Sequence, residues 1–405
     1  MLKQIEGSKA MAEAIGLCRP QVICAYPISP QTHIVEALGE MVKSEELKSC
    51  EFINVESEFA AMSVAIGSSA AGARTYTATA SQGLLFMVEA AYNASGLGLP
   101  IVMTLANRAI GAPINIWNDH SDAMSQRDSG WLQLYAETNQ EAVDLHIQAF
   151  KLAEELSIPI MVCVDGFILT HAYERVDLPT QEQVDQFLPP FEPEQILDPQ
   201  EPVSIGAMVG PEAFMEVRYL AHLKQKQALE RVPTLALEFK KIFGRDSGGL
   251  FEKYKIEDAE TVVVAMGSVV GTIKDTVDQM RADGHKIGVL SLKSYRPFPA
   301  EALGEALEKA QRVVVLEKSF ALGIGGVLSA EVHLALVQAA QLPSAQKNPL
   351  KKTYSVIAGL GGRPILKKSL RSLFEKAEKG ELAATTFLDL NQDIINKNLI
   401  ARESR

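Results

Sequence analysis

Short apolar runs of strand length alternate with helical segments along most of this chain, and this alternation is the feature that most restricts its fold. Such runs are typical of strands buried on both faces, and the helical segments between them are long enough to return the chain to the start of the next strand. The pattern therefore predicts parallel β-sheets covered by helices, an α/β fold. At 405 residues, 47% of them hydrophobic, the chain is long enough for two domains.

The first domain is predicted at residues 1–245. Proline and acidic residues dominate 179–210, which indicates an extended crossing segment, and a charged helical stretch follows at 211–243. We expect strands at 22–28, 52–55, 74–79, 101–105, 131–135 and 160–164, and helices at 33–43, 57–71, 84–94 and 139–156.

A smaller α/β domain is predicted at 255–375, followed by a C-terminal extension at 376–405. The glycines of Gly323-Ile324-Gly325-Gly326 open its last long helix but match neither a dinucleotide fingerprint nor a P-loop. We interpret Gly325 and Gly326 as close helix–strand packing, with anion binding at the helix start as the alternative. Strands are expected at 261–268, 286–292, 312–316 and 354–358, and helices at 272–282, 300–310 and 326–338.

Charge and cysteine usage exclude several classes of function. The net charge is -11 and no dense stripe of Lys and Arg exists to neutralise phosphates, so nucleic acid is not an expected partner. No cationic leader and no apolar span of about twenty residues is present, so we expect no membrane segment and a cytoplasmic location. Neither an iron–sulfur cluster nor a structural zinc is expected, because the cysteines lie far apart: Cys18, Cys24, Cys50 and Cys163.

Two hydroxyl side chains follow the first apolar run, in the sequence Ala25-Tyr26-Pro27-Ile28-Ser29-Pro30-Gln31-Thr32. The two prolines hold the backbone extended where the strand ends. Ser29 and Thr32 would then lie at the carboxyl edge of a sheet, where ligands of open α/β sheets bind. The alternative is a proline-capped loop in which Thr32 caps the next helix.

Glu58 follows the predicted strand 52–55, at the start of a helix rich in Ala, Ser and Gly. Such small side chains allow a flat ligand or another backbone to approach closely. A carboxylate in the first turn is also an ordinary stabiliser of the helix dipole. Spacing alone does not choose between Glu58 and its neighbour Glu56.

The cluster Asn118-Asp119-His120-Ser121-Asp122 contains side chains that can ligate divalent cations. No second histidine or cysteine lies at ligand spacing, so we predict a hydrogen-bonded interface loop and no metal site. Arg127, close behind, is expected to pair with these carboxylates.

A set of short motifs along the chain resembles one protein family, the alpha chain of 2-oxoacid:ferredoxin oxidoreductases, and especially the pyruvate enzyme. The resemblance covers nearly the whole chain. It implies a parallel-sheet domain that holds the aminopyrimidine of thiamine diphosphate, followed by a smaller α/β domain that resembles the C-terminal domain of transketolases. The motifs are Tyr26-Pro27-Ile28-Ser29-Pro30, Ser57-Glu58-Phe59-Ala60-Ala61, Thr79-Ala80-Ser81-Gln82-Gly83-Leu84-Leu85, Asn107-Arg108-Ala109, Asp119-His120-Ser121-Asp122 and Asp165-Gly166-Phe167.

The resemblance assigns a role to each matching residue. Glu58 matches the glutamate that contacts the pyrimidine ring, where a carboxylate favours the imino form and so creates the cofactor's internal base. Arg108 matches the arginine that binds the substrate carboxylate, for which its planar fork is suited; a surface salt bridge is the alternative. Ser29 stands where the family commonly has threonine, which leaves the substrate's size open. The cofactor-binding residues expected beside Glu58 are Ile28, Pro30, Ser81 and Gln82.

The chain has no Gly-Asp-Gly motif, with which thiamine enzymes bind the diphosphate through Mg²⁺. The resemblance therefore implies a beta subunit that supplies Mg²⁺, diphosphate binding and an Fe-S cluster. Oxidation of the substrate needs single-electron acceptors, so gamma and ferredoxin-like delta subunits are also expected. Ferredoxin is the expected electron acceptor, and coenzyme A is the expected co-substrate.

The predicted function is that of the alpha subunit of an enzyme that oxidatively decarboxylates a 2-oxoacid, with pyruvate as the first expectation. The enzyme could instead act on 2-oxoisovalerate, 2-oxoglutarate or an aryl glyoxylate such as phenylglyoxylate. Two further hypotheses are a lipoamide-coupled subunit of the transketolase type and a noncatalytic scaffold chain. The scaffold hypothesis predicts that Glu58 and Arg108 tolerate substitution.

Overall fold

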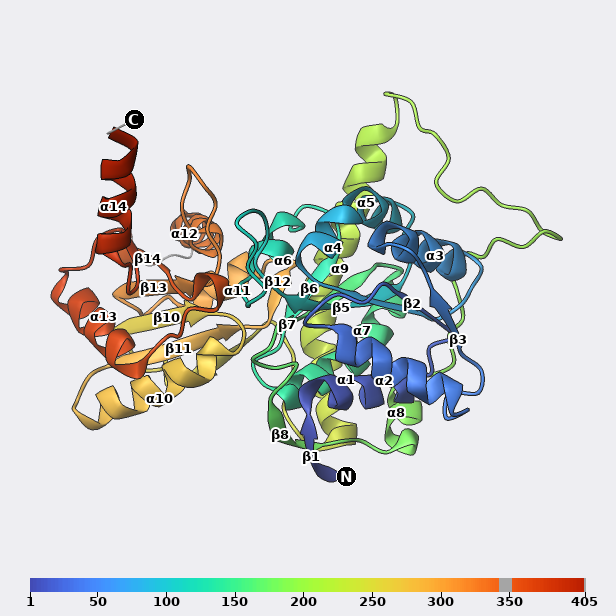
Figure 1. The fold of residues 1–405 in the computed structure, drawn as a ribbon, viewed down its shortest axis with the longest axis horizontal. Helices are drawn as coiled ribbons and strands as arrows, with labels where there is room; N and C mark the ends of the chain where they lie inside the picture. The colour runs from blue at the N-terminus through green and yellow to red at the C-terminus, as the bar shows by residue number, and fades with distance from the viewer. Residues whose placement is uncertain (342–351, 404–405) are drawn as a thin grey trace.

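Two β-sheets lie side by side along the long axis of the molecule, each between layers of helices (Figure 1). The computed structural model describes residues 1–341 and 352–403. Residues 342–351 of the predicted second domain and 404–405 of the predicted extension lie outside the described residues. The α/β fold class predicted from the alternation of strands and helices is confirmed.

The first sheet has seven strands in the order β12-β6-β7-β5-β4-β2-β3. Neighbouring strands are parallel, except that β12 runs antiparallel to β6. Every residue of the central strands β4, β5 and β7 is buried, as expected where helices cover both faces. The strands are β2 (Val22–Ala25), β3 (Glu51–Asn54), β4 (Thr75–Thr79), β5 (Ile101–Asn107), β6 (Leu132–Tyr135), β7 (Ile160–Asp165) and β12 (Ser294–Arg296).

Two groups of helices cover the first sheet (Figure 1). On one face lie α1 (Gly7–Leu17), α2 (Thr32–Lys43) and α7 (Asn139–Leu156), against which α8 (Gln181–Phe187) and the second half of α9 (Phe214–Phe243) also pack. The other face carries α3 (Glu58–Ala70), α4 (Ser81–Phe86), α5 (Val88–Gly96) and α6 (Ser121–Ser125). A short antiparallel pair, β1 (Leu2–Glu6) and β8 (Tyr173–Asp177), closes the lower end.

The second sheet has six strands in the order β15-β14-β13-β10-β11-β9, and only β9 is antiparallel to its neighbour. Its strands are β9 (Phe251–Tyr254), β10 (Thr261–Ala265), β11 (Ile287–Leu292), β13 (Arg312–Glu317), β14 (Lys352–Ile357) and β15 (Thr385–Phe387). One face packs on α10 (Val269–Ala282) and α13 (Lys367–Lys379). The other packs on α11 (Ala300–Ala306) and α12 (Val327–Ala340), and α14 (Gln392–Glu403) projects from the end of the chain.

The two sheets are joined by a shared hydrophobic core and by an exchanged strand. The cluster between them includes Met103 and Trp131 of the first unit and Tyr295 and Leu303 of the second. By sequence, β12 lies in the predicted second domain, yet it pairs with β6. Likewise, β15 comes from the predicted C-terminal extension and completes the second sheet. The domain boundaries stay a prediction. By sequence, β12 follows the predicted first domain but belongs to the first sheet, and β15 follows the predicted second domain but belongs to the second sheet.

Several elements differ from those predicted. The strand predicted at 22–28, β2, ends at Ala25, because Pro27, two residues further on, has no N–H for a ladder. The predicted helix 84–94 is two helices, which meet at Met87, where the backbone (φ -96°, ψ 9°) leaves the helical region. Residues 181–187 of the predicted extended segment form α8, whose start is a capping box between Thr180 and Gln183.

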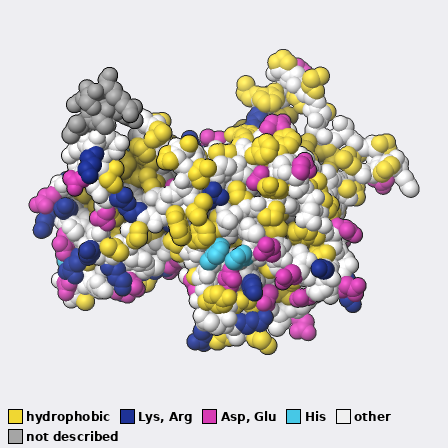
Figure 2. All heavy atoms as spheres, in the orientation of Figure 1, with side chains coloured by type: hydrophobic (Ala, Val, Ile, Leu, Met, Phe, Trp, Pro, Cys, Tyr) yellow, Lys and Arg dark blue, Asp and Glu magenta, His cyan; other side chains and the backbone are white. Residues whose placement is uncertain are grey.

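The first turns of α9 stand clear of the body and carry exposed apolar side chains (Figures 1 and 2). Those side chains belong to Phe214, Met215, Val217, Tyr219 and Leu220. Among the residues that the structure describes, no helix combines the length and the apolar character needed to cross a bilayer.

Candidate active site

Four loops that carry predicted site residues meet at the carboxyl edge of the first sheet. They follow β2, β3, β4 and β5, and they carry Ser29, Glu58, Ser81 and Arg108 in that order. Strands β3 and β4 lie on opposite sides of β2, so the direction of winding changes between β2 and β4. Ligands of open α/β sheets bind at such a switch point.

Glu58 is the first residue of α3 and is only 8% exposed. The Ser57 hydroxyl caps the helix by accepting a hydrogen bond from the Ala60 N–H at 3.2 Å, which fixes where the helix begins. Within 1–341 and 352–403, the structure gives the Glu58 carboxylate no hydrogen bond and no ion pair. Glu56 is exposed, so burial separates the two glutamates that spacing did not. A nearly buried carboxylate without a partner is costly, and such groups mark functional sites.

Gly83 leaves the space that the Glu58 carboxylate occupies. A Cβ atom on Gly83 would lie 2.7 Å from Glu58 Oε1 and 2.5 Å from Thr79 Oγ1. The Thr79 hydroxyl, at the end of β4, is itself buried without a hydrogen-bond partner in the described part of the chain. Two polar groups without partners therefore face the same gap beside α4.

Ser81 and Gln82 form the turn from β4 into α4. Ser81 is fully buried and has a φ of 48°, a left-handed conformation that is uncommon for a residue with a side chain. Its hydroxyl donates toward the Ala109 carbonyl at 2.5 Å, which links the ends of β4 and β5. Gln82 is half-buried, and its Oε1 lies 2.5 Å from the Ser81 hydroxyl.

Arg108 reaches from the end of β5 to the loop that follows β2. Its Nη1 donates to the Ser29 carbonyl at 2.9 Å, and its Nε donates to the Asn115 carbonyl at 3.4 Å. The side chain is mostly buried, and burial lowers the pKa of the guanidinium while the nearby Asp122 opposes that shift. Among the described residues, no carboxylate forms an ion pair with Arg108. The guanidinium therefore keeps its charge available for an anion.

The loop after β2 is held from two sides. Pro30 is buried, and a Cβ atom on Gly166, just after β7, would lie 2.5 Å from Pro30 Cγ. The Gln31 amide donates to the Tyr26 carbonyl at 3.0 Å and so closes the loop on itself. Ile28 is half-buried, and the Ser29 side chain is exposed at the edge.

Asp122 binds the ends of β4 and β5 together, a role that its sequence position did not reveal. It is fully buried in the first turn of α6. Its Oδ2 accepts hydrogen bonds from the main-chain N–H of Ser81 (3.0 Å) and of Arg108 (2.9 Å). Its Oδ1 accepts from Asn107 Nδ2 and from the Ala123 N–H, both at 2.8 Å. Burial raises the pKa of Asp122 to about 6, although all four hydrogen bonds favour the charged form.

Family comparisons agree with this arrangement. Residues 13–236 match the family described as pyruvate flavodoxin/ferredoxin oxidoreductase, thiamine diphosphate-binding, and residues 259–370 match pyruvate:ferredoxin oxidoreductase core domain II. The chain belongs to the 2-oxoacid:ferredoxin oxidoreductase family. The prediction made from the six motifs is thereby confirmed at the level of the family and of the enzyme class.

Curated relatives of this oxidoreductase subunit include proteins with different named substrates. Pyruvate synthase subunit PorA of Methanosarcina barkeri is 48% identical over 398 residues, which cover 96% of this chain and 97% of the relative. Ketoisovalerate oxidoreductase subunit VorA of Pyrococcus abyssi is 40% identical and covers 93% of each chain. Both relatives are named as subunits of larger enzymes.

Solved structures show the same fold. A 2-oxoglutarate:ferredoxin oxidoreductase from Magnetococcus marinus superposes with a TM-score of 0.69 at 17% identity over 93% of this chain. The oxidoreductase subunit spans 65% of the length of that chain. A split-gene transketolase superposes with a TM-score of 0.52 at 15% identity and covers 94% of this chain and 99% of its own. The predicted order of a thiamine diphosphate-binding fold followed by a transketolase-like α/β unit is confirmed.

The loop after Arg108 in the oxidoreductase subunit touches the second unit, as predicted for an interface loop. Asp119 Oδ2 accepts a hydrogen bond from the Gly361 N–H at 3.1 Å, and the His120 N–H donates to the Lys318 carbonyl at 2.7 Å. In the described part of the chain, no group of three or more His, Cys, Asp or Glu side chains is placed to hold a metal ion. The expected pairing of Arg127 with this cluster is wrong. Arg127 instead lies 3.7 Å from Asp128, because Asp122 turns inward toward the strand ends.

A second buried carboxylate, Asp165, joins the two units of the oxidoreductase subunit. Its Oδ2 lies 2.9 Å from Lys318 Nζ and accepts hydrogen bonds from the N–H and hydroxyl of Ser268, and its Oδ1 lies 2.7 Å from His120 Nε2. Burial alone would raise the pKa of Asp165, but Lys318, His120 and Ser268 outweigh burial and lower that pKa. The charges and hydrogen bonds of these neighbours therefore offset the cost of burying the Asp165 carboxylate.

The glycine-rich helix start in the second unit holds a carboxylate of the chain itself. Glu317 accepts hydrogen bonds from the N–H groups of Val327, Leu328 and Ser329 at 2.7 to 3.1 Å. A Cβ atom on Gly326 would lie 2.1 Å from Glu317 Oε1. The prediction of close packing is therefore confirmed for Gly326, where Glu317 takes the place that an external anion would need. It is wrong for Gly325, because a Cβ atom there would have no neighbour within 4 Å.

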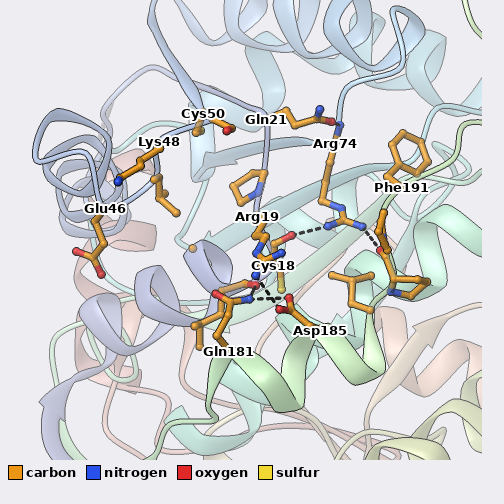
Figure 3. A pocket seen from close by; sticks show the side chains of 18 residues that line it. Cys18, Arg19, Gln21, Glu46, Lys48, Cys50, Arg74, Gln181, Asp185 and Phe191 are labelled. Carbon is orange, nitrogen blue, oxygen red and sulfur yellow. Dashed lines mark hydrogen bonds and ion pairs between the residues drawn. The ribbon is translucent and has the colours of Figure 1, made fainter.

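A large cavity lies at the opposite edge of the first sheet (Figure 3). The volume of this cavity is about 690 Å³, and Gln21, Cys50 and Arg74 on its wall precede β2, β3 and β4. Arg74 donates to the Glu154 carboxylate and to the Pro189 carbonyl, and also to the Cys18 carbonyl (Figure 3). Because the donors of Arg74 are paired within the chain, whereas the Glu58 carboxylate has no partner among the described residues, we favour the edge around Glu58 as the candidate active site.

Proposed function

We propose that this chain provides the pyrimidine-binding half of a thiamine diphosphate site in an enzyme that converts pyruvate, coenzyme A and oxidised ferredoxin to acetyl-CoA, CO₂ and reduced ferredoxin. The observation that carries the proposal is the nearly buried Glu58 carboxylate, which has no partner within the described residues. The family match and the named pyruvate synthase relatives support the reaction.

The residues at this edge fit the aminopyrimidine. A carboxylate free of internal partners can share a proton with a ring nitrogen, and Gly83, which lacks a side chain, leaves the space in which this carboxylate lies. Ile28, Pro30, Ser81 and Gln82 would hold the ring together with Glu58. When bound, thiamine diphosphate supplies the nucleophilic carbon and the electron sink that decarboxylation of a 2-oxoacid requires.

Arg108 and Ser29 would bind the substrate. The Arg108 guanidinium is fixed by the Ser29 and Asn115 carbonyls, which leaves its remaining N–H groups for the substrate carboxylate. A buried arginine binds an anion more strongly than an exposed one, because less water competes. The exposed Ser29 hydroxyl lies at the same loop and would contact the rest of the substrate.

A partner subunit would cover this edge. Large apolar side chains are exposed beside Glu58 and Arg108, namely Phe59, Phe86, Ile114, Ile116 and Trp117. Exposed apolar patches of this kind mark protein interfaces. The chain has no Gly-Asp-Gly motif, so the partner, a beta subunit, would supply Mg²⁺ and bind the diphosphate.

The electron carriers would also belong to partners. Burial raises the pKa of each of the four thiols, to about 11 for Cys50 and about 12 for Cys24. Iron–sulfur clusters are ligated by thiolates, which these environments disfavour. The beta, gamma and delta subunits would therefore carry the clusters that pass electrons to ferredoxin.

Pyruvate is the first choice of substrate because the relatives named pyruvate synthase reach 48% identity, against 40% for the ketoisovalerate relative of Pyrococcus abyssi. The test compares pyruvate, 2-oxoisovalerate, 2-oxoglutarate and phenylglyoxylate in the native complex. Coenzyme A is present, and anaerobic reduction of ferredoxin or a viologen is followed. A preference for pyruvate in kcat/KM supports the proposal, and a preference for another acid reassigns the substrate.

The same assay tests the site through a matched pair of variants, Glu58→Gln and Glu56→Gln. We expect Glu58→Gln to lower turnover by about a hundredfold or more, since it removes an acid–base contact. Glu56→Gln, at an exposed position two residues away, should retain wild-type turnover. Unchanged turnover in Glu58→Gln, with Mg²⁺ and cofactor saturating, would refute the assignment of the site.

A further inference from the structure

The carboxylate of Asp122 contacts two loops of the proposed site at once. One oxygen accepts the main-chain N–H groups of Ser81 and Arg108, which lie 41 and 14 residues away in the chain. Those two residues begin the loops that follow β4 and β5. Asp122 itself is fully buried, so it binds neither solvent nor an external ligand.

We propose that Asp122 is a positioning residue of the active site: its carboxylate fixes the backbone of Arg108 relative to the Ser81-Gln82 turn, and so sets the distance between the substrate-binding and cofactor-binding groups. This inference rests on the proposed function. It assigns to Asp122 an action through Arg108 and Ser81, without contact to substrate.

The hydrogen-bond pattern explains why a carboxylate stands at this position. All four partners of Asp122 are donors: three main-chain N–H groups and Asn107 Nδ2. A carboxylate is the side chain that accepts on both of its oxygens. An amide would place an N–H₂ group against donors on one side, and an apolar side chain would leave buried N–H groups without partners.

Both ends of Arg108 are held as a result. Asp122 fixes its main-chain N–H at 2.9 Å, while the Ser29 carbonyl fixes Nη1 at 2.9 Å. The Ser81 backbone, in its uncommon left-handed conformation, is held in the same way by Asp122 at its N–H and by the Ala109 carbonyl at its hydroxyl. Without the Asp122 carboxylate, the main-chain N–H groups of Arg108 and Ser81 lose their acceptor, and both segments of backbone can move.

A comparison of Asp122→Asn with Asp122→Ala separates the effect of losing the hydrogen bonds from the effect of losing the charge. The Asn107 Oδ1 atom is buried without a partner in the described chain, so rotation of the Asn107 amide lets it accept from the N–H₂ of Asn at position 122. The oxygen of that Asn then still accepts from Ser81 and Arg108, and only the bond from Ala123 is lost. Alanine keeps none of the four bonds.

The experiment measures kcat and KM for the 2-oxoacid in the native complex. We expect Asp122→Ala to lower kcat/KM by about a hundredfold, mostly through a higher KM, because a shift of about 1 Å in Arg108 suffices for such a loss. Asp122→Asn should lose less than about tenfold, since it keeps the two main-chain bonds. Equal losses in both variants would overturn positioning by hydrogen bonds.

A control separates positioning from general destabilisation. Asp144 is also a fully buried carboxylate, but it lies in α7, on the opposite face of the sheet from α4 and α6, and it binds Arg245. Asp144→Ala should lower the unfolding temperature and leave KM unchanged. If Asp122→Ala likewise loses stability at unchanged KM, Asp122 is structural and the inference fails.

A double-mutant cycle with Arg108→Ala distinguishes the inference from the proposed function. Because Asp122 acts largely through Arg108, the loss in the double variant should be well below the product of the two single losses. Independent effects overturn the inference. If Arg108→Ala alone leaves the KM for the 2-oxoacid unchanged, the proposed substrate role of Arg108 fails instead.

Discussion

The carboxyl edge of the first sheet and the junction between the two sheets both bury carboxylates, but they differ in what those carboxylates contact. At the junction, Asp165 meets the Lys318 ammonium, and Glu137 and Glu141 both meet Lys293. At the edge, Glu58 has no partner within the described residues, and Asp122 accepts only from uncharged N–H groups.

This difference separates groups that hold the structure together from groups that are kept for chemistry. A buried ion pair is compensated, and removing one partner is costly because the other charge is left alone. A buried carboxylate without a cation costs stability as it stands and is retained for another purpose. Substitutions at the junction should therefore act on stability, and substitutions at the edge should act on function.

The largest effect is expected at the junction. Lys318→Met leaves the Asp165 carboxylate buried without its cation, and we expect it to lower the free energy of unfolding by about 3–5 kcal/mol. Urea unfolding of the complex measures the loss, and amide hydrogen exchange in peptides from β7 and β13 places it at the junction. Lys286→Met is the matched control, because its partner Glu260 lies 3.4 Å away at the surface and the pair contributes about 1 kcal/mol or less. Equal losses in the two variants would remove the distinction between compensated and surface pairs.

A smaller effect is expected from the titration of Asp122. Burial raises its pKa from 3.8 to about 6, so between these values the folded state binds the proton more tightly than the unfolded state does. The contribution of Asp122 to stability is therefore largest at acidic pH and falls as pH rises through about 6. Relative to Asp122→Asn, the wild type should gain about 2 kcal/mol when the pH falls from about 7 to about 4.5.

The measurement compares urea unfolding of the two proteins at both pH values, because other titrating groups cancel in the difference. Asp165, whose pKa is lowered, has the opposite sign: its contribution is present above the unfolded pKa and is lost only in strong acid. If the difference in unfolding free energy between wild type and Asp122→Asn stays constant with pH, the cost of burying Asp122 is offset by its neighbours, as it is for Asp165.

The fold and much of the candidate edge could be predicted from the sequence, because both depend on local patterns. The residues Ser29, Glu58, Ser81 and Arg108 each follow a strand, and parallel strands end at the same edge of a sheet. The bounds of α7, predicted at 139–156, are the observed ones for the same reason, since Thr138 caps its start and the apolar periodicity persists to its end.

What could not be predicted depends on contacts between distant segments. Asp122 looked like a possible metal ligand or loop residue, because its partners Ser81 and Arg108 lie on other strands. Local sequence spacing also does not reveal that β12 pairs with the first sheet. Nor does it reveal that Asp122 points inward, so that Arg127 lies near Asp128 instead. The helix α8 is a different case: its capping box was present in the sequence at Thr180 and Gln183 but was outweighed by the surrounding prolines.

The smallest effect, and the sharpest test of the edge, is expected from Gly83→Ala. Alanine favours a helix over glycine by about 1 kcal/mol, so α4 should not be weakened. Its Cβ atom, however, would lie 2.7 Å from Glu58 Oε1 and 2.5 Å from Oγ1 of the fully buried Thr79, so both side chains must shift. The gain in helix propensity offsets part of the overpacking cost of about 1–3 kcal/mol, so we expect a small loss of stability. We also expect about tenfold weaker thiamine diphosphate binding and turnover, measured by cofactor titration of the apo complex and by viologen reduction. Gly96→Ala, in α5 with open space around the position, is the control that should change neither cofactor affinity nor turnover. Loss of stability in Gly83→Ala without loss of cofactor affinity would mean that the contact between Gly83 and Glu58 serves packing alone, as the ion pairs at the junction serve stability.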